Sequence, residues 1–354
     1  MQRLSELPTL EVAVLEAMIG STMSGPTQAD FDISHDVDYA YDLSHGDRFR
    51  VNALRDRNGP AAVFRRIPPR VVTADELHLA PSIRALCALR KGLVLVTGPT
   101  GSGKSTTLCA MVDLINQTRT DHIITIEDPI EFLHESAGCV VTQREVGQHT
   151  HSFRAALRAA LREDPDVILV GEMRDLETVT IALETAETGH LVLATLHTTT
   201  AASAVDRVID QFPPEQQEQI RVMLATSLRA VIAQVLCRRI DGGRVAAREV
   251  LLTTASVSHL IRQRKAFQLQ SVMQTSKAIG MVTLNDALLE LVERGEIDVT
   301  EAMSHSLDRA VMQTLLESKG YEIPPEADGG SEQPRGHTPR LEHAKLSHNR
   351  KLGG

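Results

Sequence analysis

Short apolar runs alternate with segments of helical spacing from Ser82 onward. This alternation is typical of a parallel β-sheet that helices cover on both faces, which is an α/β fold. Ligands of such open sheets bind beyond the carboxyl ends of the strands, so we expect the chemistry of this protein where these runs end. The candidate strands are residues 92–98, 122–128, 166–172 and 190–197.

Two β-rich runs precede this region, at residues 48–54 and 61–67. They flank an Asn58-Gly59 turn signal, which predicts a β-hairpin. A Pro-Pro pair directly after the second run interrupts the chain and indicates a linker. We therefore expect a small N-terminal domain over residues 1–68, a linker over 69–80 and a larger domain over 81–320.

The C-terminal part of the larger domain has a mainly helical pattern. A long helical pattern covers residues 215–235, and strand-like segments at 236–240 and 244–252 follow it. From Tyr321 the chain is rich in Pro, Gly, His and charge with little apolar spacing, which predicts a disordered tail over 321–354. Further helices are expected over 257–262, 284–294 and 300–306.

The composition argues against a membrane-spanning, a secreted or a nucleic-acid-binding protein. A chain of 354 residues with 42% hydrophobic residues can bury one or two cores, and ordinary domain sizes favour two domains. No apolar run approaches the ~20 residues that span a bilayer, and the N-terminus lacks the pattern of a signal peptide, so we expect a cytoplasmic protein without a membrane segment. A net charge of -9 and the absence of Trp argue against a nucleic-acid groove.

Four cysteines, Cys87, Cys109, Cys139 and Cys237, are scattered without a CxxC pair. This spacing favours neither a disulfide framework nor a zinc site, so we expect reduced, mostly buried thiols and no zinc.

The segment GPTGSGKST, residues 98–106, follows a candidate strand, opens a helical pattern and fits G-x-x-x-x-G-K-[ST] in full. We call these residues the P-loop. Its glycines let backbone N–H groups form a nest for phosphates, Lys104 supplies a cation to the outer phosphates, and Ser105 offers a hydroxyl to Mg²⁺. ATP and Mg²⁺ are thus the expected ligands. The predicted nucleotide-binding residues are Pro99, Thr100, Gly101, Ser102, Gly103, Lys104, Ser105 and Thr106.

Glu172 follows a buried candidate strand, where a carboxylate could deprotonate the water that attacks the γ-phosphate. Many P-loop ATPases have an Asp before this Glu, whereas this chain has Gly171. We then expect Mg²⁺ to be bound by Ser105, by Glu172 and by an acidic cluster, in part through water molecules. The alternative interpretation of this cluster is an acidic loop on the surface. The members of the cluster are Glu127, Asp128 and Glu131.

His197 ends the fourth candidate strand, at the sheet edge that carries the P-loop. A hydrogen bond that senses the γ-phosphate is the favoured interpretation, and a packing histidine is the alternative. Arg154, Arg158 and Arg162 recur every four residues on one helix face, where they form either a solvated stripe or a source of charge for the transition state. Two hairpin arginines, Arg50 and Arg65, could reach such a site from another subunit.

Residues 46–310 resemble the type II/IV secretion system ATPases, and within them the ATPases that retract type IV pili in twitching motility. The resemblance is carried by RFRVN, AVFRRIP, GLVLVTGPTGSGKSTTL, IITIEDPIEF, VTQREVGQHT, ALREDPDVILVGEMRDLET and AETGHLVLATLHTT. It implies a hexameric ring of two-lobed subunits, with a small PAS-like N-terminal domain and a RecA-like ATPase core, that turns ATP hydrolysis into mechanical work.

The resemblance also implies residue roles and partners. It implies the acidic box at 127–131, the catalytic Glu172, a histidine box with His190 and His197, and arginines that cross to the neighbouring subunit. The arginines that cross to the neighbouring subunit correspond to Arg50 and Arg65 in this sequence. The implied location is the cytoplasmic face of the inner membrane, beside the pilus platform protein.

Two departures limit what the resemblance implies. The family's usual N-terminal opening is not recognisable in residues 1–30, which predicts an incomplete small domain, and Gln263 stands where a retraction signature has an acid. Three alternatives follow: a pilus assembly or type II secretion ATPase, a conjugation-type traffic ATPase, and a nucleotide-binding ring adaptor without motor output. The intact Lys104, Ser105 and Glu172 oppose the adaptor.

Overall fold

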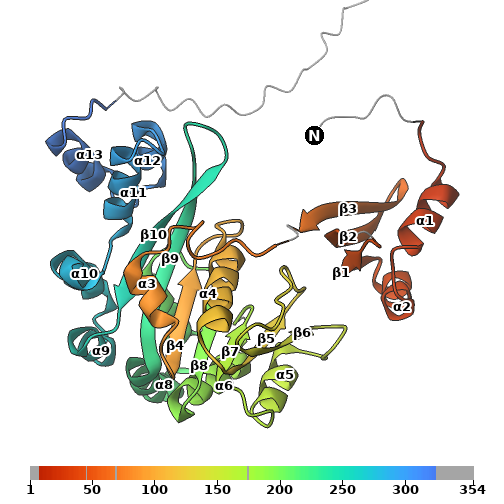
Figure 1. Cartoon of the computed structure of the whole chain (residues 1–354), viewed down its shortest axis with the longest axis horizontal. Helices are drawn as coiled ribbons and strands as arrows, with labels where there is room; N and C mark the ends of the chain where they lie inside the picture. Colours follow the sequence, from red (N-terminus) through yellow and green to blue (C-terminus); the bar gives the residue numbers. More distant parts are fainter. Residues whose placement is uncertain (1–7, 45, 68–69, 174, 324–354) are drawn as a thin grey trace, which may run out of the picture.

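The computed structural model describes residues 8–44, 46–67, 70–173 and 175–323. These residues form two lobes that lie side by side, one built on a three-stranded sheet and one on a seven-stranded sheet (Figure 1). The predicted tail over 321–354 falls almost wholly outside the described residues. None of the described helices is long and apolar enough to cross a membrane.

The small lobe is an antiparallel sheet with two helices packed on it. β2 (Arg48–Asp56) and β3 (Gly59–Ile67) form the predicted hairpin. Gly59 has a φ of +123°, which glycine adopts without steric cost. Phe31 and Val51 are buried where the helices meet the sheet. The remaining elements are α1 (Val12–Gly20), α2 (Gly25–Ser34) and β1 (Asp36–Asp42).

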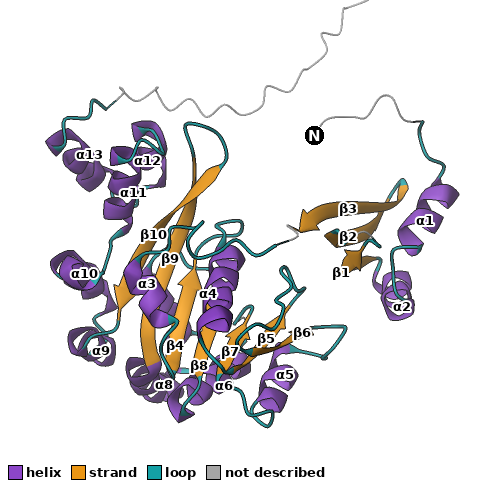
Figure 2. Cartoon of the chain, in the orientation of Figure 1, coloured by secondary structure: helices purple, strands orange, loops and turns teal. Residues whose placement is uncertain are grey.

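The large lobe is built on a sheet of order β10-β9-β4-β8-β7-β5-β6 (Figure 2). The strands from β9 to β6 pair in parallel, and β10 pairs antiparallel with β9. The four predicted strands are confirmed, and the sheet has the expected α/β pattern. Its strands are β4 (Gly92–Thr97), β5 (His122–Glu127), β6 (Val140–Glu145), β7 (Val167–Val170), β8 (Leu191–Leu196), β9 (Leu228–Arg238) and β10 (Arg244–Leu252).

Helices cover both faces of this sheet because its strands are apolar on both sides. In β4, Leu93 and Leu95 join one buried cluster, whereas Val94 and Val96 join the other. The cluster of Val94 is covered by α3 (Pro81–Leu86) and α4 (Lys104–Thr118). The cluster of Leu93 is covered by α5 (Phe153–Ala160), α6 (Leu176–Thr188), α7 (Ala201–Asp210), α8 (Pro214–Ser227), α9 (Ala255–Arg262) and α10 (Leu269–Thr275).

The helix expected over residues 215–235 is wrong in its second half. α8 ends at Ser227, and Leu228 begins β9 without an intervening loop. β9 pairs with a strand on each side, β4 and β10, so its pairing decides its structure. The strand-like segment at 236–240 is in part the end of β9, and the one at 244–252 is β10.

A separate helical cluster packs on the far ends of β9 and β10 (Figure 1). It buries Cys237, Leu288, Met312 and Leu316. Its helices are α11 (Leu284–Glu293), α12 (Val299–His305) and α13 (Arg309–Ser318).

The predicted linker packs on the large lobe wherever it is described. Ala74 and Leu79 are buried in the same cluster as Val94, so the segment from Arg70 onward belongs structurally to the larger domain.

Candidate nucleotide site

A cavity of about 520 Å³ lies where β4, β5, β7 and β8 end. Parallel neighbouring strands place their carboxyl ends at one edge, which is why segments far apart in sequence meet here. The predicted residues that line it are Arg50, Arg65, Thr100, Gly101, Gly103, Lys104, Ser105, Thr106, Glu127, Asp128, Glu131, Glu172 and His197. Pro99, Ser102, Arg158 and Arg162 are not among its lining residues.

The P-loop connects β4 to α4 in the conformation that a phosphate nest requires. Gly101 and Gly103 have φ values of +78° and +85°, in the left-handed region that favours glycine. α4 begins at Lys104, within the P-loop, so the positive end of a 15-residue helix faces the cavity. The residues present therefore fit a polyphosphate.

Lys104 is folded against its own loop. Its Nζ donates to the carbonyl oxygens of Gly98 and Pro99 at 2.9 Å and 3.1 Å. Burial lowers the pKa of this amine, whereas the negative charges of Glu172 and Glu131 act in the opposite direction. A phosphate would replace neutral carbonyl partners with charged ones, which strengthens the hydrogen bonds of the ammonium group.

Glu172 and His197 face each other across the ends of β7 and β8. A carboxylate oxygen of Glu172 lies 2.8 Å from Nε2 of His197. The two ends are held together because Thr195 donates its hydroxyl to the carbonyl of Gly171. A Cβ on Gly171 would lie 3.1 Å from the carbonyl oxygen of Ile126, so a larger residue here would need a small shift of the neighbouring backbone.

The acidic cluster is part of the cavity, which argues against a solvated surface loop. Glu127 is 8% exposed, and its Oε1 accepts hydrogen bonds from Thr125 and Gln143. Burial raises the pKa of Glu127. Glu131 is more open, with 38% of its side chain exposed. These carboxylates and the Ser105 hydroxyl are the oxygen donors that Mg²⁺ prefers, so the donor set fits that ion.

The hairpin of the small lobe supplies two arginines to this cavity within one chain. Arg50 pairs with Arg65 across β2 and β3, and both line the cavity. Arg50 lies 3.5 Å from Asp38 and 4.0 Å from Glu131, and 35% of its side chain is exposed. The expectation that these arginines serve a neighbouring subunit stays a prediction.

The arginines around α5 are placed elsewhere. α5 ends at Ala160, so Arg162 lies beyond the helix and the expected three-residue stripe is incomplete. Arg154 and Arg158 both pair with Glu177 of α6. This arrangement corresponds to the solvated interpretation and gives no support to catalytic roles for Arg158 and Arg162.

Sequence reasoning missed the contact between Arg48 and Glu145, which joins the lobes. Arg48 Nη2 lies 3.1 Å from Oε2 of Glu145, whose side chain is 3% exposed. The same oxygen accepts from the backbone N–H of Ile130, inside the acidic box. No local signal marks this pair, because the two residues are far apart in sequence.

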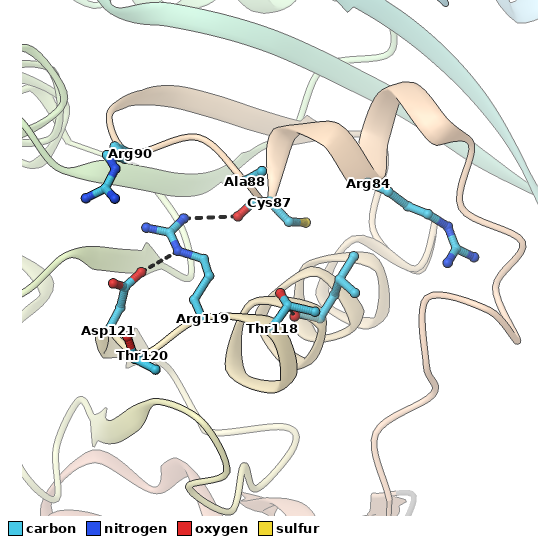
Figure 3. Close-up of a pocket in the computed structure, with 9 residues that line it drawn as sticks. Arg84, Cys87, Ala88, Arg90, Thr118, Arg119, Thr120 and Asp121 are labelled. Atoms are coloured by element: carbon cyan, nitrogen blue, oxygen red, sulfur yellow. Dashed lines mark hydrogen bonds and ion pairs between the residues drawn. The ribbon is translucent and has the colours of Figure 1, made fainter.

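A second cavity, of about 460 Å³, lies near the C-terminal end of α4 and the residues before β5 (Figure 3). It is lined by Arg84, Arg90 and Arg119 among others. Arg119 is engaged by its own chain, since it donates to the carbonyls of Cys87 and Leu89 and pairs with Asp121. None of the predicted site residues lines this cavity.

The four cysteines are buried and unpaired. Among the described residues, one of them, Cys237, lies with Glu301 and His305 so that a ligand atom from each falls within 4.8 Å of the others. Glu301 already accepts from the backbone N–H of Arg238 at 2.6 Å and contacts His305 at 3.1 Å. Burial raises the pKa of Cys237 to about 12, which keeps the thiol protonated. The absence of zinc stays a prediction.

The chain is similar to known proteins over most of its length. The model of the family described as Type II/IV secretion system protein matches residues 43–317. The type IV pilus retraction ATPase PilT of Pseudomonas aeruginosa is 51% identical over 82% of this chain and 85% of its own length. A twitching motility protein of Neisseria gonorrhoeae is 52% identical over 82% of this chain and 78% of its own. A crystal structure of the pilus retraction motor PilT with bound ADP superposes with a TM-score of 0.82 at 44% identity, covering 88% of this chain and 90% of that chain.

Proposed function

Because this chain belongs to the type II/IV secretion system protein family, we propose that it is the ATPase motor that powers retraction of type IV pili in twitching motility. The large lobe is a RecA-like core that binds and hydrolyses ATP. The observation that carries the proposal is one cavity that is lined by both the P-loop lysine, Lys104, and the carboxylate of Glu172.

Each residue around the phosphates has a task that follows from its chemistry. The N–H groups of the P-loop and the end of α4 bind the phosphates, and Lys104 adds a positive charge to the outer ones. Glu172 orients the attacking water and accepts its proton. His197, which holds the carboxylate of Glu172 at 2.8 Å, keeps the base in place and senses the γ-phosphate.

Mg²⁺ is the metal that this donor set fits. It would be held by Ser105 and, directly or through water, by carboxylates of Glu127, Asp128, Glu131 and Glu172. When bound, it neutralises charge that develops on the phosphate oxygens.

The assembled state is a homo-hexameric ring, in which Arg50 and Arg65 add positive charge to the transition state when subunits close. The exposed third of the Arg50 side chain supports this role, because it is open to a neighbouring subunit. The ring works in the cytoplasm at the inner membrane, against the platform protein of the pilus.

Two experiments test the proposed function. Purified protein should hydrolyse ATP slowly and only with Mg²⁺, because subunit closure and not the P-loop limits the rate in such rings. A strain that lacks the gene should keep surface pili and lose twitching. A strain that loses its pili instead would assign the protein to pilus assembly, and full motility would remove it from retraction.

A further inference from the structure

The side chain of Gln234 joins two parts of the P-loop region from the neighbouring strand. It stands on β9 directly after Ala233, the last β9 residue that pairs with β4, and it is 1% exposed. Its Nε2 donates to the carbonyl of Ser102 at 2.6 Å, and its Oε1 accepts from the hydroxyl of Thr107 at 2.9 Å. We propose that Gln234 is a positioning residue that sets the P-loop for phosphate binding without touching the nucleotide.

The two partners fix the orientation of the amide. A carbonyl oxygen can only accept a hydrogen bond, so the atom of Gln234 that faces Ser102 must be the NH₂ group. Its oxygen then faces Thr107, which lies in the first turn of α4 and can donate. Both ends of the amide are used, and a buried polar group with both partners is a rigid connection.

The bond to Ser102 determines where the next N–H points. In a trans peptide the carbonyl and the following N–H lie on opposite sides of the chain. When Gln234 holds the Ser102 carbonyl toward β9, the N–H of Gly103 is directed away from β9. Gly103 lines the cavity and Ser102 does not, in agreement with this geometry. The donor is therefore aimed before phosphate arrives, and no binding energy is spent on ordering it.

The loop closes tightly on Gln234. A Cβ on Gly98 would overlap the carbonyl oxygen of Gln234, and one on Gly103 would lie 3.3 Å from its Nε2. The glycines of the P-loop thus serve this contact as well as the left-handed conformation at Gly103.

The inference rests on the proposed nucleotide binding, and calorimetric titration of the full chain with MgADP separates the two. Gln234→Leu keeps the size and removes both hydrogen bonds. It should bind MgADP roughly tenfold or more weakly, and KM for ATP should rise similarly while kcat stays within a few fold, because the lost contact acts on bound substrate and transition state alike.

Asn116→Leu is the matched control. Asn116 is also a buried amide, and it hydrogen-bonds to backbone groups of Glu135, Ala137 and Cys139 at a place away from the cavity. The Asn116→Leu variant should have a lower melting temperature and an unchanged affinity for MgADP. Parental affinity in a folded Gln234→Leu protein overturns the positioning role, whereas failure of the unmodified chain to bind MgADP overturns the proposed function instead.

Two substitutions of Thr107, which disturb the core less, keep the test decisive if Gln234→Leu does not fold. Thr107→Val removes one of the two bonds, and Thr107→Ser keeps the hydroxyl that makes it. The valine variant should bind MgADP about threefold more weakly and the serine variant like the parent, since a neutral hydrogen bond contributes ~1 kcal/mol or less in net terms. Equal affinity in both variants contradicts the proposal.

Discussion

Nε2 of His197 lies 2.8 Å from a carboxylate oxygen of Glu172, so the proposed base is held by the next strand of the sheet. Glu172→Gln keeps the size of the side chain and removes the base. It should bind nucleotide normally and lose turnover by roughly 10²- to 10⁴-fold. His197→Ala should cost less, about tenfold, because the base is still present but no longer held. Steady-state hydrolysis and MgADP titration measure both, and turnover at the parental rate in Glu172→Gln would assign the water to another residue.

Lys104→Ala should remove nucleotide binding and turnover together, since the buried ammonium group is the cation of the P-loop.

The affinity of the unmodified protein for MgADP should depend on pH through Lys104. Burial lowers the pKa of Lys104, so its charged form disappears at a lower pH than that of an exposed lysine. MgADP affinity should thus fall on the alkaline side, and Lys104→Arg should flatten the fall. An affinity that rises with pH contradicts the assignment.

Mixed rings decide which subunit supplies the hairpin arginines. The double variant Arg50→Ala/Arg65→Ala should keep MgADP affinity within a few fold and lose roughly 10³-fold in turnover in assembled rings. If the arginines act across subunits, mixing this variant with Glu172→Gln should restore part of the activity, because some interfaces then combine an intact base with intact arginines. We expect this recovery.

Failure of the mixture to recover would place the arginines at the cavity of their own chain, where both already line the wall. Arg57→Ala, in the exposed turn of the same hairpin, is the control that should hydrolyse ATP at the parental rate.

Removal of one partner from the Arg48–Glu145 pair should be costly. Both side chains are largely withdrawn from water, and Arg48→Met leaves the buried carboxylate of Glu145 without a charged partner, which costs about 3 kcal/mol or more of folding free energy. Glu145→Gln should cost less, because Arg48 remains paired with Asp42. Arg48→Met and Glu145→Gln should each loosen the small lobe, measured by urea denaturation and by proteolysis between the lobes. In a double-mutant cycle the combined variant should lose less than the sum of the two, and strict additivity would show that the pair is not coupled.

Elemental analysis should find less than stoichiometric zinc. The atoms of Cys237, Glu301 and His305 are close enough to suggest a site, but Glu301 is already used by Arg238, and these three described residues are one short of the four ligands of a structural zinc site. One zinc per chain that disappears in Cys237→Ser would contradict this expectation.

The strands that carry the chemistry could be predicted because their signals are local. The P-loop motif lies between a strand and a helix, the runs that precede Glu172 and His197 are apolar throughout, and Asn58-Gly59 marks the hairpin. Each of these segments specifies its own structure, and a parallel sheet then brings their ends together.

Other parts depend on contacts that no local pattern contains. The residues on either side of Ser227 are apolar at both helical and strand spacing, and no Gly or Pro marks the change from α8 to β9, so pairing with β4 decides it. β6 has only two apolar residues because it is an edge strand. Gln234 is one amide in an apolar run, and its partner Ser102 lies 132 positions away.

β9 is one unbroken strand of eleven residues. It follows β4 as far as Ala233, passes the P-loop at Gln234, and reaches α12, where Glu301 accepts the N–H of Arg238. A strand is already nearly as long as its backbone allows, so it cannot stretch. It therefore joins the C-terminal helices to the P-loop through one extended segment, so we expect a displacement of α12 along the strand to be felt at Gln234.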